Sequence, residues 1–356
     1  MILSIIYFVL ILGLIVLVHE FGHFIFSKMF KIHVYEFSIG MGPVIWSTKK
    51  IREKKIKEGK KVSETIYCLR LIPIGGFVSL AGEGSEEDKS IKKENLMQSK
   101  PVWQRFLVMF FGAGNNFILG LVVLLIAGLI YGSPDISTKI PKVIENSPVY
   151  TMGMKDGDKI ISINGKSTKT LDDVQLYLTL ANGKETEFKV LRNNQELKFK
   201  VVPLSGKEME EKGYSFGIQF NNKLEKGFTR SVDFAFKKWY SIARQVFITI
   251  KELITGGVSL KELSGPVGIY SAVDTTRHSG FYSVLILTAM LSINVGILNL
   301  IPFPAFDGGR ILFIIIEKLR GKAIKAETEN MIHNIGFFLL IALLIYVTFN
   351  DILRLF

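Results

Sequence analysis

Four apolar stretches of this 356-residue chain are long enough to cross a lipid bilayer, and no other feature constrains its fold as strongly. A hydrocarbon core of roughly 30 Å requires about 20 residues of helix. Because 48% of the residues are hydrophobic, the chain is also too apolar for an ordinary soluble protein. We therefore predict an α-helical polytopic membrane protein with four transmembrane helices, at residues 1–27, 106–131, 281–316 and 331–350.

The first stretch predicts a retained transmembrane helix and not a cleaved signal peptide. It has no basic start, its apolar run is longer than that of a signal peptide, and no cleavage site with small residues follows it. Four spans then place both ends of the chain on the same side of the membrane.

The basic residues between the spans predict an orientation. Residues 28–105 contain 16 Lys and Arg against 9 Asp and Glu, and the loop before the fourth span is also basic. Because Lys and Arg accumulate in cytoplasmic segments, we expect both regions in the cytoplasm and both termini outside it. The net charge of +12 is spread over loops without a nucleic-acid motif, so we expect contact with the headgroups of the lipid bilayer and no nucleic acid.

Residues 134–227 have the pattern of a small α+β domain on the outer side. A run beginning at Gly157 and Asp158 leads into an alternating strand and a turn, and "LDDVQLYLTLA" has helical spacing. The segments "ETEFKVLR" and "ELKFKVVPL" alternate as a hairpin. An unspecialised extracytoplasmic domain is the alternative interpretation.

Residues 228–280 predict amphipathic helices. One face of the first helix is apolar, and its residues are Trp239, Ile242, Val246, Ile250 and Leu253, with Lys238, Arg244 and Lys251 among the other positions. Such a helix fits the membrane interface, and it equally fits packing against the other spans.

The first span ends with the motif His19-Glu20-Phe21-Gly22-His23. Residues four apart lie on one face of a helix, so both imidazoles can bind one metal ion while Glu20 reaches a water on it. Ionisable groups are costly inside a membrane and usually mark a site. Zinc is the default metal, because it takes nitrogen and oxygen ligands and keeps one position for water at catalytic sites.

Two histidines do not complete a zinc site, and we expect Asp307 to be the third ligand. The first and third spans cross the membrane in the same direction, and both place these residues in their later part, so the depths agree. Glu317 is the alternative carboxylate, but it lies beside Lys318 and Arg320 and predicts a solvated surface charge. The single cysteine, Cys68, excludes a cysteine cluster.

Residues 62–82 predict a membrane-associated β-hairpin that turns at Gly75 and Gly76. An exposed edge near Phe77 would pair with substrate and hold it extended, the strand-addition mode of peptide recognition. A purely structural hairpin is the alternative.

Seven ordered segments together resemble a known family. They are "VHEFGHFIFSK", "EFSIGMGP", "RLIPIGGFVSLAGE", "KPVWQRFLVMFFGAGNNF", the run at Gly157-Asp158, "LSGPVGI" and "NLIPFPAFDGG". The chain resembles bacterial site-2 proteases, intramembrane zinc metalloproteases of the regulator-of-sigma-E protease type, in the form with one inserted PDZ-like domain. The resemblance implies a multi-pass protein of the bacterial inner (cytoplasmic) membrane.

The resemblance also implies an activity and roles for residues. Single-pass membrane protein substrates, such as anti-sigma factors or signal-peptide remnants, would be cleaved within or near the bilayer, after an upstream site-1-type protease has acted. His19, His23 and Asp307 would bind Zn²⁺, and Glu20 would be the general base. Asn294 and Asn299 would lie near the metal and hold the scissile segment; hydrogen bonding between helices is their alternative role.

The sequence departs from the family in three places. Phe111-Gly112-Ala113 replaces a common Ala-Gly-Pro, Phe306 replaces a Leu, and the PDZ-like region lacks an obvious carboxylate-binding loop.

Two other functions are compatible with the residues. A transporter would use the buried His and Asp as a proton relay, but it usually has internal repeats, and we find none. A catalytically silent scaffold would not need the complete His, Glu and Asp set.

Overall fold

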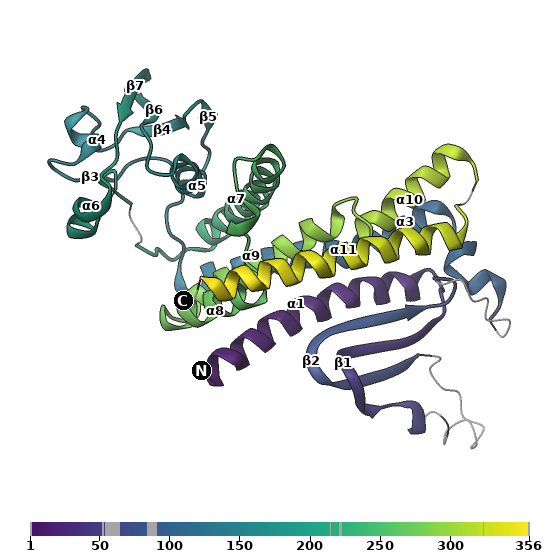
Figure 1. Cartoon of the computed structure of the whole chain (residues 1–356). Coiled ribbons are helices and arrows are strands. Elements are labelled where there is room, and N and C mark those ends of the chain that lie inside the picture. The colour runs from purple at the N-terminus through teal and green to yellow at the C-terminus, as the bar shows by residue number, and fades with distance from the viewer. Residues whose placement is uncertain are drawn as a thin grey trace. The chain divides into compact units, whose positions relative to one another are not determined.

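The computed structural model describes residues 2–51, 53, 65–83, 91–213, 215–220, 223–322 and 324–354 (Figure 1). The chain forms two compact units. One combines Met1–Gly120 with Leu263–Phe356, and the other is Leu121–Glu262, so the division falls inside the helix α3 (Val102–Tyr131). Residues 62–64, where the predicted β-hairpin begins, lie outside the described residues.

Four helices of the described residues are long and apolar enough to cross a membrane, as predicted. They are α1 (Ile2–Met29), α3, α9 (Phe281–Leu300) and α11 (Ala326–Leu353). The protein is therefore a multi-pass membrane protein.

The third predicted stretch, 281–316, is not one continuous helix. The helix α9 ends at Leu300, and α10 (Asp307–Arg320) begins after an irregular segment that contains Pro302 and Pro304. A proline has no N–H to donate and its ring obstructs the preceding turn, so the two prolines end the helix. The break places Asp307 at the first residue of a new helix.

Glycines allow the helices of the first unit to approach one another closely. A Cβ atom at Gly22 of α1 would lie 1.9 Å from the carbonyl oxygen of Phe111 in α3. A Cβ at Gly120 of α3 would lie 2.6 Å from the side chain of Ile293 in α9. Small residues are favoured where membrane helices pack backbone against backbone. These two contacts hold α1 and α9 against α3.

The strands β1 (Val34–Ser47) and β2 (Ile66–Leu80) form an antiparallel sheet with an irregular register (Figure 1). Residues 36–39 of β1 have partners in both 66–69 and 76–79 of β2; Ser38, for example, lies opposite Cys68 and Phe77. We expected the two halves of the 62–82 region to pair with each other. Instead, a segment of β1 lies between them and pairs with both. Local strand and turn patterns do not predict this pairing.

The helix α8 (Pro266–His278) is capped by a side chain from α11. The carboxylate of Asp351 accepts hydrogen bonds of 2.8 Å from the N–H groups of Gly265 and Gly268. The residue at the N-cap position, Gly265, has no side chain to satisfy the free N–H groups of the first turn. The cap therefore ties the end of the fourth span to the helix that precedes the third.

The second unit begins as an α+β domain, in agreement with the predicted elements. Its four-stranded antiparallel sheet has the order β5–β4–β6–β7, and β3 pairs with β8. The strands are β3 (Lys142–Val143), β4 (Lys159–Ile163), β5 (Lys166–Ser167), β6 (Thr186–Arg192), β7 (Gln195–Val201) and β8 (Ile218–Gln219). The helices are α4 (Pro148–Thr151), α5 (Leu171–Ala181) and α6 (Gly206–Lys212). Ile160, Val174 and Phe188 are buried in its core.

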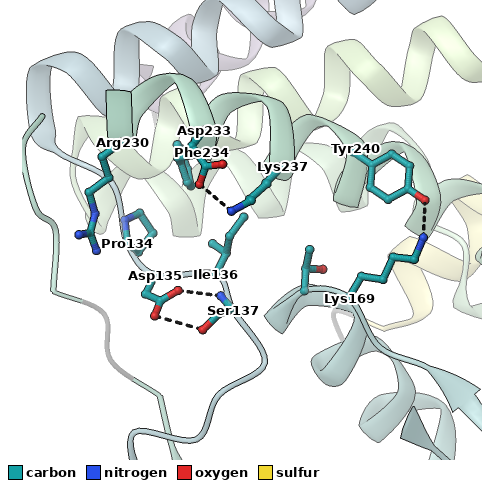
Figure 2. Close-up of a pocket in the computed structure, with 11 residues that line it drawn as sticks. Pro134, Asp135, Ile136, Ser137, Lys169, Arg230, Asp233, Phe234, Lys237 and Tyr240 are labelled. Carbon is teal, nitrogen blue, oxygen red and sulfur yellow. Dashed lines mark hydrogen bonds and ion pairs between the residues drawn. The ribbon is translucent and has the colours of Figure 1, made fainter. Parts of the chain in front are cut away.

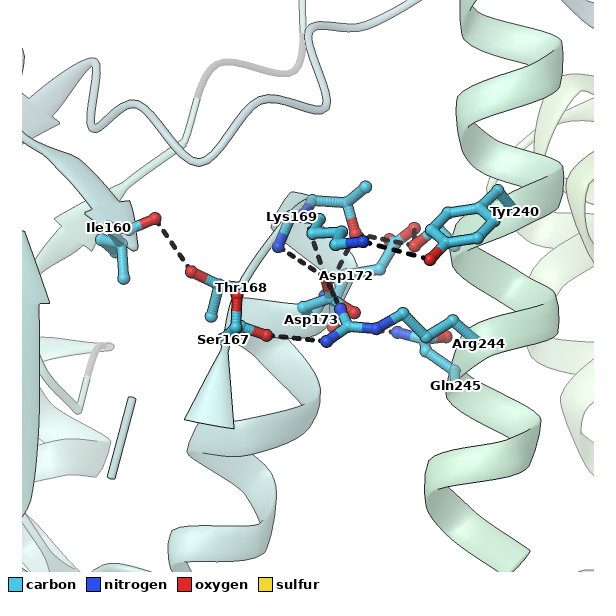
Figure 3. Close-up of polar contacts among 11 residues, drawn as sticks. Ile160, Ser167, Thr168, Lys169, Asp172, Asp173, Tyr240, Arg244 and Gln245 are labelled. Carbon is cyan, nitrogen blue, oxygen red and sulfur yellow. Dashed lines mark hydrogen bonds and ion pairs between the residues drawn. The ribbon is translucent and has the colours of Figure 1, made fainter. Parts of the chain in front are cut away.

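The long helix α7 (Phe228–Thr255) docks on α5 through its polar face (Figure 3). Lys238 donates to Asp172 at 2.6 Å, and Arg244 forms an ion pair with Asp173, whose side chain is 1% exposed. Of the five residues that we expected on one apolar face of this helix, Ile242 is buried. Two of the three charged residues assigned to the other positions, Lys238 and Arg244, make contacts with α5, because the start of α5 presents two carboxylates. Short 3-10 turns occur at Lys93–Asn95, Met97–Ser99 and Leu260–Glu262.

Candidate metal and catalytic site

The two histidines of the first span and Asp307 meet at one point of the first unit. The Nε2 atoms of His19 and His23 lie 3.3 Å apart, and each lies 3.3 Å from Oδ2 of Asp307. The three side chains are mostly buried, with 10–16% of their surface exposed. The histidines are four residues apart on α1, and Asp307 comes from the start of α10.

This triangle has the dimensions of a tetrahedral zinc site. Donor atoms about 2.05 Å from a tetrahedral ion lie about 3.3 Å from one another. The Oδ2 atom of Asp307 is buried and has no hydrogen-bond partner among the described residues. A buried carboxylate oxygen without a donor is costly. The three residues therefore fit a metal ion, with the fourth position of the tetrahedron left for water or substrate.

The imidazole of His23 is oriented from its other side. Its Nδ1 lies 2.9 Å from the carbonyl oxygen of Val108 in α3, which requires the ring hydrogen on Nδ1 and leaves Nε2 free to bind a metal. A Cβ atom at Gly112 would lie 2.2 Å from Nε2 of His23. The helix α3 thus supplies both the acceptor and the space for this ring.

The imidazole of His19 lies beside Asn116, a fully buried residue of α3 that our sequence analysis did not select. Nδ1 of His19 is 3.5 Å from Nδ2 of Asn116, while Oδ1 of Asn116 has no partner among the described residues. A half-turn of the amide brings Oδ1 to the imidazole and lets it accept the Nδ1 hydrogen. Ser292 of α9 donates to the backbone carbonyl of Asn116 at 2.8 Å. An Asn in an uncharged span was the available sequence signal.

The segment before Asp307 is folded tightly against the end of α9. A Cβ at Gly308 would lie 2.2 Å from the carbonyl oxygen of Ile301, and a Cβ at Gly309 would lie 2.5 Å from that of Phe303. Only glycine fits at these two positions, which explains the Asp-Gly-Gly sequence. The compact turn returns the chain toward α1 and directs the carboxylate of Asp307 to the histidines.

Glu20 lies between the histidines and the β sheet. Its side chain is half-buried and interacts electrostatically with His19, His23 and Asp307. A Cβ added at Gly76 of β2 would lie 3.5 Å from Cγ of Glu20. The strand β2 therefore passes directly beside the candidate general base.

The remaining predicted residues are placed as follows. Asn294 is half-buried in α9 and its Oδ1 has no hydrogen-bond partner among the described residues. Asn299 is half-buried and is the penultimate residue of α9, and neither Asn is among the partners found for the three candidate ligands in the described part of the chain. Gly75 has a φ of +87°, and the ring of Phe77 lies 5.0 Å from the guanidinium of Arg70.

In the described part of the chain, two of the cavities lie outside this site. The larger, of about 550 Å³, is in the second unit, between residues 134–137, the start of α5 and α7 (Figure 2). Its wall contains the ion pair of Lys237 with Asp233, at 2.7 Å. The smaller, of about 70 Å³, is in the first unit and contains the bidentate ion pair of Arg105 with Glu317. The pairing of Glu317 with Arg105 agrees with our choice of Asp307 as the carboxylate at the histidines.

A His-Glu-x-x-His helix and a carboxylate that converge among membrane-spanning helices define a membrane-embedded metallopeptidase. The sequence profile of peptidase family M50 matches residues 7–343. The chain therefore belongs to peptidase family M50, the zinc metalloproteases of the site-2 protease type.

Curated relatives that align over almost their whole length support this assignment. The chain is 36% identical over 351 residues to a putative zinc metalloprotease of Clostridium perfringens, with 98% of each chain covered. It is 32% identical over 430 residues to the zinc metalloprotease RasP of Bacillus licheniformis, with 99% of each covered. It is also 32% identical over 431 residues to the regulator of sigma-W protease RasP of Bacillus subtilis, again with 99% of each covered.

Proposed function

We propose that this protein is an intramembrane zinc endopeptidase in which His19, His23 and Asp307 hold the ion and Glu20 is the general base. The observation that carries the proposal is the triangle of donor atoms with 3.3 Å sides. Its size matches tetrahedral zinc, and it joins two residues of α1 to one residue of α10, a helix far away in the sequence.

The chemistry divides between the ion and the chain. Bound zinc lowers the pKa of a water molecule toward neutrality and polarises the scissile carbonyl. The carboxylate of Glu20 accepts the proton of the attacking water and passes it to the leaving amine. Val108 and Asn116 hold the imidazoles in the tautomers that leave Nε2 free. The amide of Asn294, whose Oδ1 has no partner among the described residues, would bind the substrate backbone, and Asn299 would act with it.

We propose that the edge of β2 binds the substrate in an extended form. Residues 76–79 pair with β1 on one side, and among the described strands none pairs with their other side. This edge begins at Gly76, beside Glu20. An intact helix shields its peptide bonds, so addition of the unwound segment to this edge would present a peptide bond to the general base. Gly75, Gly76 and Phe77 are the residues assigned to this contact.

The substrates would be single-pass membrane proteins, such as anti-sigma factors or signal-peptide remnants. The name of the Bacillus subtilis relative, a regulator of sigma-W protease, supports the first class. Cleavage would follow trimming by an upstream site-1-type protease, in regulated intramembrane proteolysis. We assign residues 134–227 as a PDZ-like domain outside the cytoplasm, where the basic segment 28–105 predicts both termini as well.

The test combines metal content with cleavage. Purified protein in lipid nanodiscs should contain about one zinc per chain, and His19→Ala should lose it. Glu20→Gln should keep its zinc, because the residue is not a ligand, and lose cleavage of a single-pass reporter. The proposal fails if Glu20→Gln cleaves at the wild-type rate, or if His19→Ala retains stoichiometric zinc.

A further inference from the structure

The fourth span contacts the segment that carries the proposed metal ligand. The backbone N–H of Ala305 donates to Nδ1 of His333 in α11 at 3.1 Å. Ala305 lies two residues before Asp307 in the irregular segment between α9 and α10. Ala305 is half-buried and lies outside any helix or strand, so His333 provides the acceptor that regular secondary structure does not provide for this N–H.

The backbone conformation of Ala305 is one that needs support from its surroundings. Ala305 has a φ of +84°, a backbone region that residues other than glycine rarely adopt. Such a conformation is strained for a residue with a side chain and persists only where the surroundings impose it. The hydrogen bond to His333 is therefore one of the contacts that hold the segment in a shape it would not adopt by itself.

A second contact lies one turn further along α11. A Cβ at Gly336 would lie 2.4 Å from Cβ of Pro304 and 2.5 Å from its carbonyl oxygen. The backbone of α11 thus rests directly on Pro304. His333 and Gly336 are three residues apart and lie on the same helical face. Together they fix both residues of the Pro304-Ala305 pair.

The ring of His333 is itself held in one orientation. It packs edge-on against Phe313, with ring centroids 5.5 Å apart, and its side chain is 15% exposed. Because Nδ1 accepts a hydrogen bond, the ring hydrogen of the neutral form is on Nε2, which lies 4.0 Å from a carboxylate oxygen of Glu329. The acceptor atom is thus directed at Ala305.

We propose that His333 is a positioning residue for the metal site. It does not reach the ion or the substrate; it acts through Ala305 on the backbone that places Asp307, and the proposal rests on the proposed role of Asp307 as a ligand. Metal–ligand distances tolerate about 0.2 Å, so a small relaxation of this segment is sufficient to weaken the oxygen ligand. Many side chains of α11 are exposed, so its contact with this segment is a localised feature of the helix.

The test uses three substitutions in the full-length protein. His333→Leu removes the acceptor and keeps a branched apolar side chain. His333→Asn places an amide oxygen close to the position of Nδ1 and can accept the same hydrogen bond. Asn334→Leu is the matched control, since Asn334 is exposed on the same turn of α11. Each apoprotein is titrated with zinc against a competing chelator, and its visible spectrum with Co²⁺ is recorded.

We expect His333→Leu to bind zinc about 10-fold more weakly, the lower end of losses for residues that orient metal ligands, and to show an altered Co²⁺ spectrum. His333→Asn should recover most of the affinity, and Asn334→Leu should match the wild type. Wild-type affinity in His333→Leu overturns the proposal, as does an equal loss in the Leu and Asn variants. Loss of zinc in His19→Ala is measured in parallel; if that variant retains zinc, the proposed metal site itself is wrong.

Discussion

The contact between Gly112 and His23 allows a prediction with a calculable displacement. In Gly112→Ala the new Cβ would lie 2.2 Å from Nε2 of His23, whereas an ordinary contact begins at 3.4 Å. The ring or the helix must therefore move by 3.4 − 2.2 = 1.2 Å. This is about six times the 0.2 Å within which metal–ligand distances normally fall. The imidazole cannot move this far and keep its bond to the ion.

We expect Gly112→Ala to lose about 100-fold or more in zinc affinity and in cleavage of a single-pass reporter, since misplacement by 1 Å alone can cost about 100-fold in rate. Gly114→Ala is the control, because its Cβ would meet Phe111 at 3.3 Å, close to an ordinary contact, on the same helix. Zinc titration against a chelator measures the loss, and thermal melting of both apoproteins separates it from misfolding. Wild-type zinc affinity in a folded Gly112→Ala protein would refute the assigned position of His23.

Three further predictions address other parts of the chain. Phe77→Pro should abolish cleavage without lowering zinc content. Ile45→Pro is the control, because residues 44–47 of β1 pair with residues 68–70 of β2 and form the other outer segment of the sheet; it should reduce cleavage less. Equal effects of the two substitutions on cleavage would contradict the edge proposal. Asp351→Ala should lower stability by about 1–2 kcal/mol through the lost cap, measured by thermal melting, with Asp351→Asn intermediate. Arg244→Met should destabilise the docking of α7 by about 3–5 kcal/mol, because the buried carboxylate of Asp173 loses its ion-pair partner, and hydrogen exchange in α7 should rise.

The network around Asp173 connects α5 with α7 in the second unit. Its carboxylate accepts from the backbone N–H groups of Lys169 and Thr170, at 2.7 and 3.1 Å, as well as from Arg244 (Figure 3). One buried charge therefore completes the capping box of α5, whose N-cap is Thr170, and also binds Arg244 of α7. A Met at position 244 removes only the second role.

Local patterns were sufficient for several parts of the molecule. The four spans depend on about 20 consecutive apolar residues each, and the lateral placement of His19 and His23 depends on the 3.6-residue period of one helix. The helix and strands of the α+β domain follow from capping residues, alternation and turn residues, such as Thr170 and Asp173 at the start of α5. Each of these features depends on residues that are close together in the sequence, so local sequence patterns are sufficient to predict them.

Tertiary structure decided which distant groups meet. The carboxylate of Asp307 was selected from its expected depth, but its 3.3 Å contact with histidines 288 and 284 positions earlier (307 − 19 and 307 − 23) required the fold. Local patterns did not predict that a segment of β1 lies between two parts of β2. They also did not predict the roles of Asn116 and His333. A polar residue in an apolar helix shows that a partner is needed, because desolvation is costly, but spacing along one helix cannot identify a partner on another.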